Sequence, residues 1–109
     1  MYRASTPKHV FCFDFDPEKY FEQIQISYAQ DDEIILTKEK KDLLFETKES
    51  ACGTVYTASL QLTQEETNLF GQRPFASVQI RFLDTHQNII TTPTVRIRIE
   101  QVLNDEVLK

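Results

Sequence analysis

The chain has 109 residues, with 12 Lys or Arg against 17 Asp or Glu, so its formal net charge is −5. Hydrophobic residues make up 40% and charged residues 27%, a globular composition that excludes a disordered tail. The chain lacks the basic footprint of nucleic-acid-binding proteins, and no apolar run approaches the ~20 residues that span a bilayer. We therefore expect a single domain over residues 1–109, with no nucleic-acid partner and no membrane partner.

The N-terminal residues 1–7 lack the apolar core of a secretory signal, which predicts residence in a cytoplasm. Cys12 and Cys52 are then expected to be free thiols, because reducing compartments disfavour disulfides. A disulfide between them stays open as the alternative.

Period-two alternation of apolar side chains predicts strands in eight segments: residues 8–15, 21–30, 33–38, 43–46, 54–62, 75–83, 89–90 and 94–102. Pro17 ends the first segment and predicts a turn over residues 14–19, and residues 47–53 are expected to form a loop. Asp31 and Asp32 connect the second and third segments as a hairpin without the usual Gly.

Alternation also predicts which side chains face the interior. The inward positions expected from this pattern are Phe11, Phe13, Phe15, Ile24, Ile26, Tyr28, Tyr56, Ala58, Leu60, Leu62, Ala76, Val78, Ile80, Phe82, Val95, Ile97 and Ile99. The third segment breaks the pattern, since Ile34, Ile35 and Leu36 are consecutive and apolar. Either both faces of that strand are covered, or Ile35 is exposed and available to a partner, as Val10 would be on the first strand.

One stretch leaves the period of two. Thr63 followed by Glu66 matches a capping box, in which each side chain accepts a hydrogen bond from the other residue's backbone N–H. A helix this short is marginal by itself, so we expect Leu69 and Phe70 to hold it on the sheets and Gly71 to turn left-handed after it. The predicted fold is an all-β, antiparallel β-sandwich of about eight short strands with one short helical turn.

Outward charges form a row at Arg81, Arg96, Arg98 and Glu100. If the two strands are neighbours, cross-strand pairs such as Arg81 with Glu100 are the structural account, which we favour. If they are not, Arg81, Arg96 and Arg98 form a docking surface for an acidic partner, and with Ile35 they are the candidate interface residues.

Catalytic and metal motifs are weak. His9 and His86 are the only imidazoles and neither adjoins a recognisable nucleophile motif, so we expect no enzyme activity and assign no catalytic residue. The acidic runs are Asp14, Asp16 and Glu18, and Asp31, Asp32 and Glu33; they are expected to be solvated turns without Ca²⁺. We expect no cofactor and no metal site.

An ordered set of motifs resembles a family of short structural proteins encoded in phage and prophage genomes of Gram-positive bacteria. The motifs are Phe11-Cys12-Phe13, Ser27-Tyr28-Ala29-Gln30, Leu62-Thr63-Gln64-Glu65-Glu66-Thr67 with Phe70, Val78-Gln79-Ile80-Arg81-Phe82-Leu83, and Val95-Arg96-Ile97-Arg98-Ile99 through Val102-Leu103. The chain departs from the family at Asp31-Asp32-Glu33 and Gln87-Asn88, where the family more often has Gly.

The resemblance implies a non-enzymatic structural protein of the virion tail, baseplate or head-fibre class. Its partners would be other virion proteins or further copies of itself, and its location the virion or the cytoplasm of the bacterial host. The alternative is a β-sandwich module that binds carbohydrate or another small ligand through exposed aromatic rings. Tyr2, Tyr20 and Tyr56 are the candidates for such stacking, with Tyr20 first.

Overall fold

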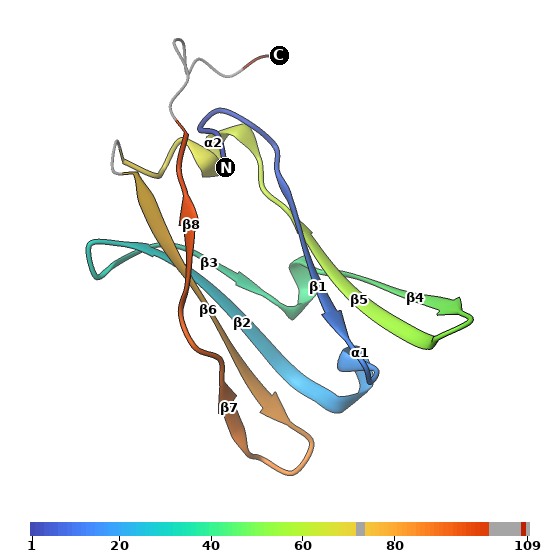
Figure 1. The fold of residues 1–109 in the computed structure, drawn as a ribbon. Helices are drawn as coiled ribbons and strands as arrows, with labels where there is room; N and C mark the ends of the chain where they lie inside the picture. The colour runs from blue at the N-terminus through green and yellow to red at the C-terminus, as the bar shows by residue number, and fades with distance from the viewer. Residues whose placement is uncertain (72–73, 101–107, 109) are drawn as a thin grey trace.

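The computed structural model describes residues 1–71, 74–100 and 108, and within them the chain is an all-β sandwich with short helices (Figure 1). The strands are β1 (Lys8–Phe13), β2 (Phe21–Gln30), β3 (Glu33–Glu39), β4 (Leu44–Ser50), β5 (Gly53–Gln61), β6 (Phe75–Asp84), β7 (Ile89–Thr91) and β8 (Val95–Arg98). The helical segments are α1 (Pro17–Tyr20), η1 (Lys40–Asp42) and α2 (Gln64–Thr67). Residues 101 and 102 of the last predicted strand, and the Leu103 motif residue, lie outside the described residues.

Two antiparallel sheets form the layers of the sandwich. One has three strands in the order β1-β5-β4, and the other has five, with β3-β2-β6 followed by β7 and β8. β7 pairs with one half of β6, from Arg81 to Leu83, and β8 pairs with the other half, from Phe75 to Val78. Pro93, which has no N–H for a ladder, lies between the two short strands. The five-stranded sheet therefore ends in an interrupted edge.

The interior contains the side chains that alternation predicts for β2, β5 and β6, except that Tyr56 and Ile80 are only partly buried. Ile26, Tyr28 and Leu60 are at most 1% exposed. Phe21 stacks on Phe82 with ring centroids 4.2 Å apart, which ties β2 to β6 through the interior. Leu62, Phe70, Ala76, Val78 and Ile99 join the same core cluster. Phe15, expected inside with Phe11 and Phe13, is exposed because β1 ends before it.

Of two hairpins, one confirms the sequence prediction and the other contradicts it. The Asp31–Asp32 turn forms as predicted, with φ of 51° and 64°, so two aspartates adopt the left-handed conformation that Gly usually supplies. The predicted loop over residues 47–53 is wrong, because β4 continues to Ser50 and pairs with β5 around a two-residue turn. Nearly every β4 side chain is exposed, and the hairpin tip extends away from the five-stranded sheet (Figure 1). A strand without a buried face shows no apolar alternation.

The expectation of one helical turn is also too low, since α1 replaces the turn predicted after Pro17. Proline is favoured in the first helical turn, where no N–H is needed, and the Asp16 carboxylate accepts a hydrogen bond from the Glu18 N–H at 3.1 Å. The short 3₁₀ segment η1 has its own capping box, between Glu39 and Asp42.

The capping box of α2 is confirmed. Thr63 Oγ1 accepts from the Glu66 N–H at 3.1 Å, and Glu66 Oε1 accepts from the Thr63 N–H at 3.0 Å. Phe70 is buried as expected, but Leu69 is 56% exposed, because adjacent residues after a one-turn helix point in different directions. Gly71 is not left-handed either; its N–H donates to Gln30 Oε1 at 2.6 Å, which joins the helix end to β2.

Candidate functional site

The three candidate arginines lie on the outer face of the five-stranded sheet, where all three are exposed. The guanidinium of Arg96 lies 4.1 Å from the centre of the Phe75 ring, and Arg98 forms an ion pair with Glu100 at 2.8 Å. The strands are neighbours, as the structural account requires, but the predicted pairing of Arg81 with Glu100 is wrong. β8 pairs only with the beginning of β6, so Arg81 lies opposite Gln25 of β2 and Thr91 of β7.

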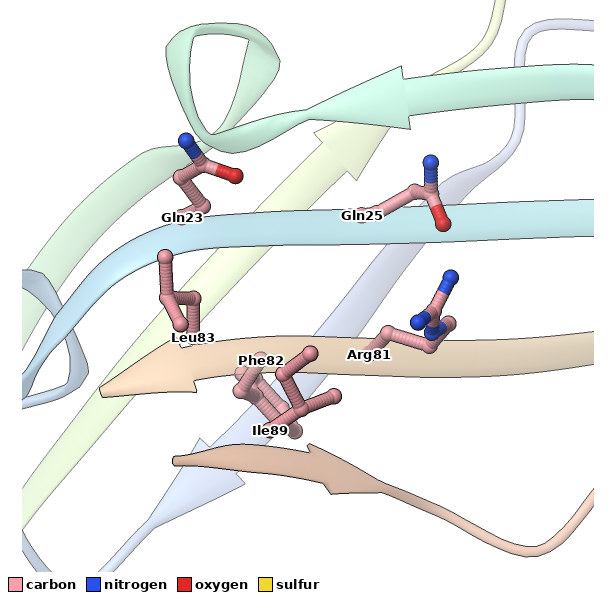
Figure 2. A pocket seen from close by; sticks show the side chains of 6 residues that line it. All are labelled: Gln23, Gln25, Arg81, Phe82, Leu83 and Ile89. Carbon is pink, nitrogen blue, oxygen red and sulfur yellow. The ribbon is translucent and has the colours of Figure 1, made fainter. Parts of the chain in front are cut away.

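Arg81 faces a shallow hollow of about 160 Å³ on this outer surface (Figure 2). Gln23 and Gln25 come from β2, and the side chains of Arg81 and Gln25 lie next to each other in the close-up view. Leu83 and Ile89 supply an apolar border on the β6 and β7 side. A second, more polar hollow of about 450 Å³ follows the same face toward Ser27 and Asp31. Both hollows are open to solvent, so they would enclose little of a small ligand.

Ile35 is not the exposed apolar residue of β3. The register of β2 with β3 shifts between Tyr28 and Ala29, which leaves Ile35 as the extra residue of a β-bulge. Ile35 packs against the core, and Ile34 is 64% exposed instead. The bulge explains the three consecutive apolar residues, because it shifts the alternation by one position.

An open apolar groove of about 330 Å³ lies at one side of the sandwich, between the two sheets. β1 forms one wall with His9 and Phe11, while β6 and β8 form the floor and the other wall. The remaining lining residues are Val78, Ile80, Thr92, Pro93, Val95 and Ile97. Val95 lies opposite Val78 in the ladder, so its side chain points to the inner face, yet it is 61% exposed. The three-stranded sheet therefore leaves part of the inner face uncovered.

His9 marks the boundary between this groove and the closed interior. Its Nδ1 lies 2.6 Å from the hydroxyl of Tyr28, whose side chain is fully buried. Burial, with a contribution from the N-terminal amine, lowers the pKa of His9, and burial together with the nearby Glu66 raises the pKa of Tyr28. Both groups are therefore held neutral, and they share one hydrogen bond whose direction is set by the tautomer of the imidazole. This is a structural hydrogen bond that sequence reasoning missed.

Lys38 and Glu66 form a second partly buried polar pair. Their ion pair joins β3 to α2. Glu66 Oε1 also accepts from the Thr63 N–H in the capping box of α2. Burial alone would raise the pKa of Glu66, but hydrogen bonds from Lys38 and Thr63 leave it below the usual value. Glu66 is therefore ionised, and its ion pair with Lys38 stabilises the attachment of α2 to β3.

The Asp84 carboxylate stabilises the turn between β6 and β7. Asp84 accepts from the backbone N–H groups of Asn88 and His86 at 2.8 and 2.9 Å, and these bonds lower its pKa. Gln87 in this turn has a φ of 66°, at a position where Gly was expected. Among the described residues, no group of three or more His, Cys, Asp or Glu side chains is arranged to hold a metal ion. Cys12 and Cys52 are free and exposed.

Comparisons with protein-family models, curated proteins and solved structures gave no match to this chain. In the part of the chain that the structure describes, no helix has the length and apolar character needed to cross a membrane.

Proposed function

We propose that this chain is a non-enzymatic structural protein that acts through protein–protein contacts, as a component of the tail, baseplate or head-fibre class of a phage or prophage virion. The interaction part of this proposal rests on the apolar groove between β1 and β8, where Val95 and Ile97 point inward and no strand of the described residues covers them. Uncovered apolar surface of this kind is typical of protein interaction sites. The virion class rests on the sequence motifs around Thr63 and Val78.

The test is incorporation into particles. A tagged copy would be expressed in a lysogen that carries the gene, and particles would be purified by density gradient after induction. The expected result is that the chain sediments with the particles and that Val95→Glu, which places a charge in the groove, reduces incorporation. Ile89→Glu is the matched control, because Ile89 is 62% exposed but lies away from the groove. Particles that lack the wild-type chain would refute the virion assignment.

A specific observation favours a second candidate, a carbohydrate-binding module. Tyr20 is 48% exposed and lies beside Phe15, which is 38% exposed, with ring centroids 5.4 Å apart. Two partly exposed rings provide a stacking platform for a sugar. A glycan array compares the two candidates: specific hits that disappear in Tyr20→Ala would favour carbohydrate binding, and an array without hits would remove it.

A further inference from the structure

β1 is an edge strand with a free side, because within the described residues it pairs with β5 alone. The Leu62 N–H donates to the Pro7 carbonyl at 3.0 Å, so these two residues form a hydrogen-bonded pair. This pair fixes which of the following β1 residues bond to β5. In an antiparallel pair, residues alternate between bonding inward and bonding outward. The backbone N–H and C=O groups of Lys8, Val10 and Cys12 therefore point away from β5.

The free side of β1 borders the apolar groove. The groove is lined by β1 and not by its neighbour β5, and by β6 and β8 but not by β2, so it lies at the side where both sheets end. Toward Lys8 the opening is closed by the N-terminus, where Met1 donates to the Arg98 carbonyl and Arg3 donates to the Glu100 carbonyl. Toward Phe13 it stays open beside Thr92 and Pro93.

We propose that β1 accepts a strand from another protein, which extends the three-stranded sheet over β8. The proposal rests on the proposed function and adds the mode of contact and the class of partner. The occupant is an extended segment with branched apolar residues at alternate positions, which enter the groove above Val95 and Ile97. Its backbone pairs with Val10 and Cys12, and an acidic residue opposite Lys8 complements the charge at the closed end.

The observations favour a detached segment over a second folded copy. Only an extended backbone can pair with a row of β1 groups spaced two residues apart, and only alternate side chains can enter the groove beside it. A second copy that joined through its own β1 would bring its own β8 toward this β8, because β1 and β8 lie on the same side of the sandwich. A segment without its own second sheet brings no β8 to this side.

The test uses a synthetic peptide, Thr-Val-Thr-Ile-Thr-Val-Glu, with capped ends. In antiparallel register its third, fifth and seventh residues lie opposite Cys12, Val10 and Lys8, and its apolar residues face the groove. Amide hydrogen exchange of the full chain is measured by NMR with and without peptide. We expect the exchange of Val10 and Cys12 to slow by about tenfold or more, while Phe11, already bonded to β5, changes little.

Matched variants separate backbone pairing from groove filling. N-methylation of the fifth peptide residue removes the bond to Val10 and is expected to weaken binding about tenfold, whereas N-methylation of the fourth, whose N–H points to solvent, is tolerated. Val95→Glu is expected to abolish binding, and Ile89→Glu, on an equally exposed residue, to leave it unchanged.

Three outcomes would overturn the proposal that β1 accepts a strand from another protein. The first is no binding up to about 1 mM peptide, and the second is binding that leaves the exchange of Val10 and Cys12 unchanged. The third is protection of these amides at high protein concentration without peptide, which would identify a second copy as the occupant. Each leaves the particle-incorporation experiment free to succeed, so the failure of this contact mode is distinguishable from failure of the proposed function.

Discussion

The inner face of the five-stranded sheet differs between its covered and uncovered parts. On β2, Ile26 and Tyr28 are fully enclosed, whereas on β8 Val95 is 61% exposed and Ile97 is only partly buried. Both strands alternate apolar and polar residues in the same way and direct the apolar ones inward. The difference arises from the opposite sheet, which has three strands against five. An apolar side chain stabilises the fold only to the extent that another layer covers it.

The largest expected effect is a cavity in the covered part. Leu60 lies on β5 of the opposite sheet and is 1% exposed in the core cluster that encloses Ile26 and Tyr28, so Leu60→Ala should lower the free energy of unfolding by about 3 kcal/mol. Urea unfolding followed by circular dichroism measures this change. A loss below about 1 kcal/mol would mean that the covered part is packed less tightly than described.

The next effect concerns the N-terminal cap of α2, the short helix that follows β5. Thr63→Ala removes the acceptor for the Glu66 N–H and should cost about 1 kcal/mol of unfolding free energy. Thr63→Ser is the control, because its hydroxyl can accept the same bond. Equal losses in both variants would show that the cap is not the cause.

A smaller, pH-dependent effect is expected at the boundary between the two parts. The pKa of His9 is lower in the folded protein than its usual value of about 6.5, which applies to the unfolded chain. Below about pH 6.5 the unfolded chain therefore binds more protons than the folded protein does. The contribution of His9 to stability is therefore present above that pH and is lost as the pH falls toward the folded pKa. Urea midpoints between about pH 7 and pH 5 should fall more steeply for the wild type than for His9→Gln. Identical pH profiles would contradict the prediction.

The smallest effect is expected in the uncovered part. Val95→Ala removes an apolar side chain that is 61% exposed, so the free energy of unfolding should change by less than about 0.5 kcal/mol. The comparison with Leu60→Ala gives the contrast between the two parts directly. A loss above about 1 kcal/mol in the isolated protein would show that Val95 is covered in solution, for example by another copy.

Prediction from the sequence succeeded where the determining interactions are close along the chain. The limits of β2, the Asp31–Asp32 hairpin and the Thr63 capping box all follow from patterns within a few residues. It failed at the exposed β4 hairpin, which is held by backbone pairing and has no apolar face to detect. For the candidate interface, the three arginines lie on one outer face as expected, but Ile35 does not join them because of a bulge.

By itself, the sequence determined that this chain builds strands and which side chains of each strand point inward, because a period of two is a property of local backbone geometry. The tertiary structure decided which strands lie at the edges, that β7 and β8 share one neighbour, and that the β1 edge borders an apolar groove. These features depend on pairing between residues far apart in the chain. Alternation is the same for a covered strand and an uncovered one, so no local pattern distinguishes Ile26 from Val95.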